Sequence, residues 1–488
     1  MFHVHAALME PGKTQNSIDS VNEEPRIAMS HLPDPTAFTD VPTSAADADA
    51  TRDGNHTIIS PDHPALHAMG RIDLTDPTRP VWVYPYTQVS FRFTGTSLGV
   101  TVVNHWNYGD TKLGVIVDGV QTAIRIPSGF TGANDMPNSS TSEGTDAEPV
   151  TAVETDNAAQ EDVAVHTDAA PTYGPVTVTL ADRLPDIEHE VTLFKRQDGQ
   201  HYLEVLDYRL DEGATILQPA TPEPTRRIEV FGDSVSCGER NEASLYVGRL
   251  DPAADLSGYS NAWYSYAAIT ARNLSAQLHD TSQGGISLLD GIGWFAGPDY
   301  VGQESAWDCI QYNPVLGESK PWDFSRYTPH VVVVAIGQND AHPDDFMASD
   351  YDGERARHWR TRYVDFLKSL HAHYPKATIV CLTTVLQHDP AWDRAIGEAV
   401  RTFNTEPDAP ASAPYGRFAE GDAPVADGTT NDEIRTLRDA GSHAVAHHFL
   451  FTRNGSATPG HPRVAEHEEM ARELTTFIES LGEVVWQD

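Results

Sequence analysis

Six consecutive apolar residues at 331–336, Val-Val-Val-Val-Ala-Ile, constrain the fold of this chain more than any other feature. A strand without a polar position has no solvated face, so it belongs in a sheet that is covered on both sides, as parallel sheets are. A second strand is expected at 377–382, and the apolar positions around 228–231 predict a third. Amphipathic helices are predicted at 261–277, 357–373 and 463–481. Strands that alternate with helices predict a three-layer α/β/α domain with a parallel sheet, which we assign to residues 227–488.

The part of the chain before this domain has a different pattern. Residues 61–218 carry many short alternating or apolar runs that are separated by turn residues, with little helical periodicity between them. This pattern is typical of a β-sandwich. The expected strands lie at 81–84, 88–93, 98–103, 113–119, 176–180, 189–195 and 203–206.

Three segments around the sandwich are too polar to form a core of their own. Residues 1–60 are rich in Ser, Thr, Asp, Pro and Ala and are expected to be a disordered or loosely packed leader. Residues 131–170 are acidic and small, which predicts a disordered insertion in a sandwich loop. Residues 219–226 contain several prolines and read as a semi-rigid linker.

The charge balance limits the partners of this chain. Its 71 acidic and 33 basic residues give a formal net charge of -38. Phosphates and anionic lipid headgroups are bound by Lys and Arg, so neither nucleic acid nor a membrane is an expected partner. There is also no apolar run of about 18 residues that would form a transmembrane helix.

The cysteines and the first ten residues bear on the location of the protein. Cys237, Cys309 and Cys381 are far apart and show neither metal-site nor disulfide spacing, so buried structural thiols are expected. Residues 1–10 lack the basic region and long apolar stretch of a signal peptide. These features together predict a cytoplasmic protein.

Reactive residue types follow the predicted strands at their carboxyl ends, where open α/β sheets place their chemistry. Ser234 stands in Gly-Asp-Ser directly after the first strand, and Gly284-Gly285 follows the helix at 261–277. Asn339 comes just after the strand at 331–336, and His461 precedes the closing helix. A serine hydroxyl needs an adjacent base to act as a nucleophile, and a histidine can supply it.

The order Ser, Gly, Asn, His resembles the four blocks of the SGNH/GDSL hydrolases, over residues 227–485. The preceding β-domain, with Gly70-Arg71-Ile72-Asp73-Leu74, the stretch 91–97 and Val117-Asp118-Gly119, is similar to the N-terminal jelly roll of carbohydrate esterase family 2. So are the stretch 265–268, Trp322-Asp323-Phe324 and His461-Pro462. That family removes acetyl groups from O-acetylated plant polysaccharides and oligosaccharides.

The resemblance implies a role for each residue. Ser234 would be the nucleophile and His461 the base, while the N–H groups of Ser234 and Gly285 and the Asn339 side chain would form the oxyanion hole. Gly284 is an alternative backbone donor, because the register of this block is ambiguous. These groups need no metal or other cofactor, and none is expected.

One position departs from the superfamily. Most SGNH hydrolases carry an Asp three residues before the catalytic histidine, where this chain has Thr458. Carbohydrate esterase family 2 resembles this chain in using a Ser-His dyad whose imidazole is oriented by backbone carbonyls. No catalytic Asp is therefore expected, and Asp233 and Asp340 are interpreted as structural residues.

The remaining histidines and aromatic residues have ordinary structural explanations. His443, the His447-His448 pair and His467 are expected to pack or to face solvent, and the pair lacks the spacing of a metal site. Trp294 and Trp307 lie in stretches that read as a loop over the sheet edge, and they are the first candidates for stacking on a sugar ring.

The sequence thus predicts an esterase that removes acetyl groups from xylan- or mannan-derived oligosaccharides through an acyl-enzyme. A lipase or thioesterase on the same fold is an alternative, against which the polar composition and the lack of a lid-like apolar helix count. A non-catalytic carbohydrate-binding protein is another, but all four blocks are filled.

Overall fold

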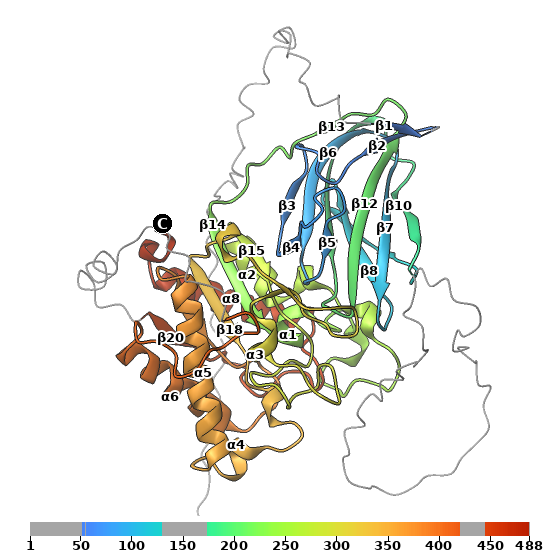
Figure 1. The fold of residues 1–488 in the computed structure, drawn as a ribbon. Helices are drawn as coiled ribbons and strands as arrows, with labels where there is room; N and C mark the ends of the chain where they lie inside the picture. The colour runs from blue at the N-terminus through green and yellow to red at the C-terminus, as the bar shows by residue number, and fades with distance from the viewer. Residues whose placement is uncertain (1–50, 54, 129–172, 420–444, 488) are drawn as a thin grey trace, which may run out of the picture. The chain divides into compact units, whose positions relative to one another are not determined.

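The computed structural model describes residues 51–53, 55–128, 173–419 and 445–487. In this part of the chain two antiparallel sheets are followed by a five-stranded parallel sheet with helices on its faces (Figure 1). The predicted fold class, a β-sandwich before a three-layer α/β/α domain, is confirmed. None of the helices in the described ranges is long and apolar enough to cross a bilayer.

The antiparallel sheets form the sandwich. The first runs β1-β2-β12-β5-β4, with β7 on β12 and β10 on β7, and the second runs β13-β6-β11-β8-β9, with β3 on β6. The strands of the first sheet are β1 (Thr51–Asp53), β2 (His56–Ile59), β4 (Ile72–Asp73), β5 (Val81–Trp82), β7 (Leu98–Trp106), β10 (Pro175–Ala181) and β12 (His201–Asp211). Those of the second are β3 (His67–Met69), β6 (Gln88–Gly95), β8 (Lys112–Val117), β9 (Val120–Arg125), β11 (Ile187–Lys195) and β13 (Ile216–Leu217).

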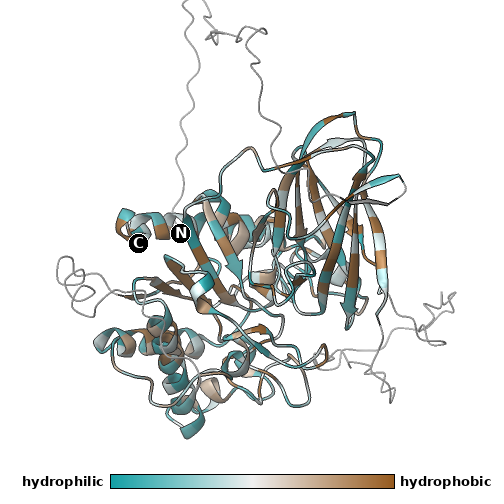
Figure 2. Ribbon diagram, turned by 45° about the horizontal axis from the view of Figure 1, so that its top comes forward, coloured by the Kyte–Doolittle hydropathy of each residue, from teal (hydrophilic) through white to brown (hydrophobic). Residues whose placement is uncertain are grey.

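Strand periodicity builds the core between these two sheets. In β6 the apolar residues Val89, Phe91 and Phe93 alternate with partly exposed Ser90 and Arg92, as expected for a strand with one buried face. The apolar faces of both sheets meet in one cluster, and Figure 2 shows the alternation of apolar and polar residues along the strands.

The parallel sheet determines where the chemistry can lie. Its strand order is β15-β14-β18-β19-β20, and every neighbouring pair is parallel. The strands are β14 (Arg226–Gly232), β15 (Ala276–Asp280), β18 (Val331–Ala335), β19 (Thr378–Cys381) and β20 (Ala446–His448). After β14 the chain forms β15 along one edge of this strand, and it then crosses over to form β18 along the other edge. Ligands bind at such a switch point, beyond the carboxyl ends of the strands.

Helices cover the sheet on both faces. On one face α2 (Tyr266–Asn273) and α8 (Val464–Ser480) share an apolar cluster with Val331 and Val333 of β18. On the other, α5 (Glu354–His373) and α6 (Pro390–Thr405) pack on Val332 and Val334. The short elements in this domain are α1 (Ser234–Cys237), α3 (Gln303–Ala306), α4 (Phe346–Ser349) and the two-stranded β16 (Cys309–Gln311) and β17 (Lys320–Pro321).

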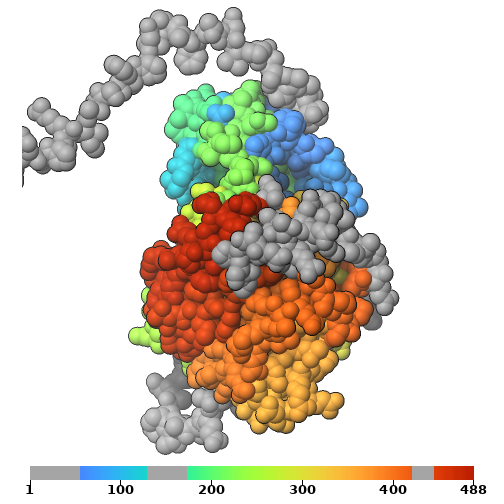
Figure 3. Space-filling view, turned by 90° about the vertical axis from the view of Figure 1, so that its left-hand side faces the viewer, coloured from blue at the N-terminus to red at the C-terminus, as the bar shows by residue number. Residues whose placement is uncertain are grey.

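The chain after residue 445 lies beside the region of α6. Figure 3 shows the segment from 445 onward, in red, next to the orange residues that precede 420. The Asn404 side chain joins the two segments, because it donates to the carbonyl of Ala446 and accepts from the N–H of the same residue. This contact holds β20 at the edge of the parallel sheet.

A buried ion pair connects the sandwich to the strand that carries the serine. Arg71 donates through Nε to Glu229 of β14 at 2.9 Å, and both side chains are fully buried. The guanidinium also donates to the carbonyls of Trp307 and Cys309. The Arg-Ile-Asp stretch of the sandwich is therefore part of the packing beneath the carboxyl end of β14.

Some boundaries differ from those predicted. Strand β2 lies within the expected leader of residues 1–60, and its Ile59 is buried in the sandwich core. The helix expected at 261–277 spans only 266–273. The residues at its start form a 3₁₀ turn at Ala262–Tyr264, and those at its end belong to strand β15 instead. The predicted acidic insertion at 131–170 lies outside the described residues.

Candidate active site

Ser234 lies at the carboxyl end of β14, as the first residue of the short helix α1. The preceding residue, Asp233, caps this helix, since its Oδ1 accepts from the N–H of Val235 at 2.9 Å. Burial raises the pKa of Asp233 to about 7, although the bond from Val235 opposes this shift. The first N–H groups of a helix have no partner within it, so the Ser234 N–H remains able to donate.

The oxyanion loop, residues 281–286 after β15, brings the two glycines beside Ser234. A Cβ built on Gly284 would lie 3.8 Å from the Cβ of Ser234. The N–H of Gly284 already donates to Asp198 Oδ2 at 2.6 Å. Gly285 is thus the glycine whose N–H suits an oxyanion, and its φ of +75° favours glycine at that position.

Asn339 begins the 3₁₀ turn Asn339–Ala341 after β18, on the opposite side of the switch point. Its Nδ2 donates one hydrogen bond to the carbonyl of Ile286 at 2.9 Å, which ties it to the oxyanion loop. A primary amide has two N–H donors, so the second can point to a developing oxyanion. The three predicted donors therefore come from adjacent elements.

His461 lies between two carboxylates. Its Nδ1 is 3.5 Å from Asp251 Oδ2, and its Nε2 is 3.5 Å from Glu239 Oε2. Glu239 also lies against the oxyanion loop, because its Oε2 would be 2.8 Å from a Cβ on Gly284. Its N–H donates to the Ser234 carbonyl. Glu239 thus connects the surroundings of the serine to those of the histidine.

Asp251 was missed by the sequence reasoning, which expected no carboxylate partner for His461. Arg463 donates to its Oδ1, and an Arg240 nitrogen lies 3.2 Å from its Oδ2. Burial alone would raise the pKa of Asp251, but His461 beside it and the bond from Arg463 hold this pKa well below its usual range. An ionised carboxylate at Nδ1 fixes the imidazole tautomer and stabilises the imidazolium that forms during catalysis.

Thr458 connects the loop that carries Asp251 to helix α8. Its hydroxyl accepts from the N–H of Gly248 at 2.9 Å, and its own N–H donates to Glu466 of α8 at 2.9 Å. Thr458 stands where most SGNH hydrolases carry Asp. It therefore anchors the loop that brings a different carboxylate, that of Asp251, to His461. No sequence signal identifies Asp251, because it lies in an irregular loop far from His461 along the chain.

Of the other histidines considered from the sequence, the three that the structure describes are not at this site. His467 is buried in α8, accepts from the N–H of Tyr266 at 3.1 Å, and has its pKa lowered by burial to about 3. His448 lies on β20 at the sheet edge, where burial lowers its pKa, and His447 packs its ring on Phe477. His443 lies outside the described residues. No cluster of three or more His, Cys, Asp or Glu side chains suited to a metal occurs in the described ranges.

The acidic residue after Asn339 and the cysteines are structural. Asp340 is fully buried and accepts from the Leu288 N–H and the Trp359 indole at 2.8 and 2.7 Å. Burial raises its pKa to about 6 despite these bonds. All three cysteines are buried and none forms a disulfide in the described part of the chain.

The two tryptophans named as sugar-stacking candidates lie in different environments. Trp294 is 42% exposed, its Cβ is 2.9 Å from a Cβ built on Gly285, and its ring stacks on His342 at 3.4 Å. Trp307 is only 2% exposed and packs on Phe231 and Phe366 in the core. The prediction of Trp307 in a loop over the sheet edge is therefore wrong, because its apolar surroundings bury it.

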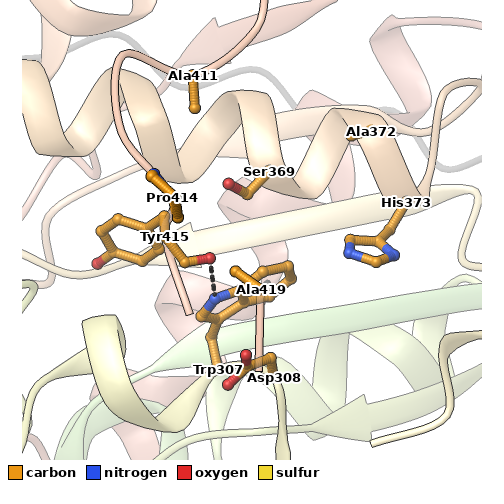
Figure 4. A pocket seen from close by; sticks show the side chains of 9 residues that line it. All are labelled: Trp307, Asp308, Ser369, Ala372, His373, Ala411, Pro414, Tyr415 and Ala419. Atoms are coloured by element: carbon orange, nitrogen blue, oxygen red, sulfur yellow. Dashed lines mark hydrogen bonds between the residues drawn. The ribbon is translucent and has the colours of Figure 1, made fainter. Parts of the chain in front are cut away.

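Trp307 borders a cavity of about 290 Å³ that is separate from the site. Its indole donates to the carbonyl of Tyr415, as Figure 4 shows. The cavity lies between α5 and the segment 411–419 and is not lined by Ser234, Gly285, Asn339 or His461. The residues around it are Trp307, Asp308, Ser369, Ala372, His373, Ala411, Pro414, Tyr415 and Ala419.

The strand order of the parallel sheet, with Ser234, Gly285 and Asn339 after its strands, fits the SGNH hydrolase fold expected from the motifs. Comparison with known proteins narrows the class. Residues 68–144 match the family model of the carbohydrate esterase 2 N-terminal domain, so the resemblance to carbohydrate esterase family 2 expected from the motifs is confirmed.

Two characterised relatives have similar sequences. The cellulase/esterase CelE of Acetivibrio thermocellus is 28% identical over 322 residues, which cover 66% of this chain and 31% of CelE. An acetylxylan esterase/glucomannan deacetylase of Cellvibrio japonicus is 31% identical over 194 residues, 40% of this chain and 49% of that protein. The chain thus matches less than half of the length of either relative.

The fold is also that of solved carbohydrate esterases. A family two carbohydrate esterase from Clostridium thermocellum, solved in complex with cellohexaose, superposes with a TM-score of 0.57 at 22% identity. The match covers 86% of this chain and 100% of that structure. Both the sandwich and the α/β domain therefore have counterparts in one protein fold.

Proposed function

We propose that this protein is a carbohydrate O-acetyl esterase that releases acetate from acetylated xylan- or mannan-derived oligosaccharides. The observation that carries the proposal is that Gly284 lies beside both Ser234 and Glu239, that Asn339 bonds to the same loop, and that Glu239 lies 3.5 Å from His461. The similarity to an acetylxylan esterase/glucomannan deacetylase supports acetylated sugars as substrates.

The reaction would proceed in two halves. Ser234 Oγ attacks the acetyl carbonyl while His461 Nε2 accepts its proton, and the new oxyanion binds to the N–H groups of Ser234 and Gly285 and to Asn339 Nδ2. Collapse of this intermediate breaks the bond to the sugar oxygen, which leaves with the proton from His461. In the second half, water gives a proton to His461 and attacks the acetyl-enzyme. Acetate then leaves, and the proton returns to Ser234 Oγ.

Three neighbouring side chains would support these steps. Asp251 would hold the His461 ring and stabilise its protonated form. Trp294 is exposed beside Gly285, so its face would support the sugar that carries the ester. Glu239, whose carboxylate lies beside Gly284 and 3.5 Å from His461 Nε2, would accept a hydrogen bond from a sugar hydroxyl.

Acetate release from acetylated xylo- and manno-oligosaccharides tests the proposal. The wild-type protein should release acetate, and Ser234→Ala should lower the rate by about 10⁶-fold, as removal of a serine nucleophile does. Ser236→Ala is the matched control, because this serine is buried on the same turn but its hydroxyl bonds to Tyr266. No release by the wild-type protein, with binding retained, would instead support a non-catalytic carbohydrate-binding protein.

A further inference from the structure

The loop that joins β11 to β12, residues 196–200, belongs to the sandwich by sequence but is buried against the α/β domain. Arg196, Gln197, Asp198 and Gln200 are all at most 6% exposed. Connecting loops normally run over the surface, since a buried loop needs partners for its backbone groups. This loop finds them in the neighbouring domain, because Asn313 donates to the carbonyl of Gly199 at 2.7 Å.

The carboxylate of Asp198 is directed at the oxyanion loop. Its Oδ2 accepts from the N–H of Gly284 at 2.6 Å and from Gln283 Nε2 at 2.8 Å. Its Oδ1 accepts from the N–H of Gln200 within its own loop. Lys195 fixes the base of this loop by donating to the carbonyls of Gln197 and Asp198.

The glycine at position 284 of the oxyanion loop leaves room for the Asp198 carboxylate to reach the backbone. A Cβ on Gly284 would lie 2.9 Å from Asp198 Oδ2, so a side chain at this position would displace the carboxylate from the backbone N–H. Gln283 is held a second time, because its Oε1 accepts from the Tyr312 hydroxyl at 2.6 Å and from the Gly199 N–H at 3.2 Å. Asp198 thus fixes the peptide group that joins Gln283 to Gly284, and Gln283, which it also holds, donates to the carbonyl of the next peptide, the one that carries the Gly285 N–H.

We propose that Asp198 is a positioning residue for catalysis, through which the N-terminal sandwich sets the orientation of the Gly285 N–H in the oxyanion hole. The inference rests on the proposed function, because it concerns the same site. It gives the sandwich a part in the chemistry, in addition to any part in binding glycan. A preorganised donor stabilises the transition state only when it already points to the oxyanion.

The experiment compares Asp198→Ala and Asp198→Asn with Gln197→Ala in the full chain. Gln197 is the matched control, since it is equally buried in the same loop but bonds to Asp110 and Ser257, away from the oxyanion loop. Two readouts are used: kcat and KM for 4-nitrophenyl acetate, and the rate at which a fluorophosphonate probe labels Ser234. Phosphonylation also places charge on an oxygen in the oxyanion hole, and it needs no carbohydrate.

For Asp198→Ala we expect kcat and the labelling rate to fall together by about 10²-fold, as loss of one oxyanion donor does, with KM nearly unchanged. Asp198→Asn should fall less, because its amide oxygen can still accept from Gly284. Gln197→Ala should lose thermal stability but keep most of its kcat. Equal losses of kcat in Asp198→Ala and Gln197→Ala at equal stability would overturn the inference, as would native turnover in folded Asp198→Ala.

The same data separate this inference from the proposed function. A wild-type protein that is labelled by the probe but releases no acetate from sugars contradicts the substrate assignment alone. A tenfold or larger drop in labelling on Asp198→Ala, and not on Gln197→Ala, would support the positioning role in that case as well. If the Ala variant does not fold, the Asn variant decides, and native kcat and labelling in it would contradict the inference.

Discussion

Replacing Asp251 by Asn should slow turnover without preventing the protein from folding or binding substrate. The carboxylate lies 3.5 Å from His461 Nδ1, and at this distance, with an effective dielectric constant of about 20, it attracts an imidazolium by about 5 kcal/mol. Arg463 and Arg240 share the carboxylate and weaken its field at the ring. We therefore expect a loss of about 3 kcal/mol of transition-state stabilisation, which lowers kcat by about 100-fold.

The assay is the steady-state hydrolysis of 4-nitrophenyl acetate, with melting temperatures measured on the same samples. Asp255→Asn is the matched control, because Asp255 lies in the same loop but its carboxylate accepts from the N–H of Ser257. Asp251→Asn should lower kcat and leave KM within a few fold, whereas Asp255→Asn should keep native kcat. Native kcat in a folded Asp251→Asn variant would refute the role of this carboxylate.

Three further predictions follow from other parts of the structure. Asn339→Ala removes a side-chain donor, so kcat should fall by about 10² to 10³-fold at unchanged KM in the same esterase assay; a loss below tenfold would exclude Asn339 from the oxyanion hole. Arg71→Met leaves Glu229 buried without its partner, which should cost about 3 to 5 kcal/mol of unfolding free energy in urea titrations, and Arg71→Met/Glu229→Gln should recover part of it. Burial lowers the pKa of His467 to about 3, against 6.5 in the unfolded chain. Between these two pH values only the unfolded state binds the extra proton, so the free energy of unfolding falls as pH decreases. His467→Gln should remove about 2 kcal/mol of the loss between pH 7 and pH 5, and an unchanged pH dependence of unfolding would show that this histidine does not titrate as described.

The parts of the fold that could be predicted are those in which local periodicity and tertiary burial agree. The run at 331–336 is apolar at every position, and its first five residues form β18, which has helices on both faces. The segment 261–277 is a counter-example: its apolar spacing predicts one long helix, but Ala276 and Gln277 pair with β14 as a strand. Pairing with a central strand overrides helix propensity there.

The candidate site shows the same division. Ser234, Gly285 and Asn339 each follow a buried strand, so their meeting at one edge of the sheet follows from topology. Asp251 and Asp198 could not be found in this way, because both lie in irregular loops and each reaches the site from a distant part of the chain. The prediction for Trp307 failed for a different reason. Glycines and prolines near this residue suggested a surface loop, but Phe231 and Phe366 pack against its ring.

The central claim, that Ser234 takes an acetyl group from a sugar ester, is tested most directly by acid quenching during turnover. Protein mixed with acetylated xylo-oligosaccharide would be quenched within the first turnovers, digested, and mapped by mass spectrometry. The account predicts an acetyl group on Ser234, absent without substrate and absent from Ser234→Ala. Acetate release with the acetyl group on another residue, or undiminished release by Ser234→Ala, would contradict it.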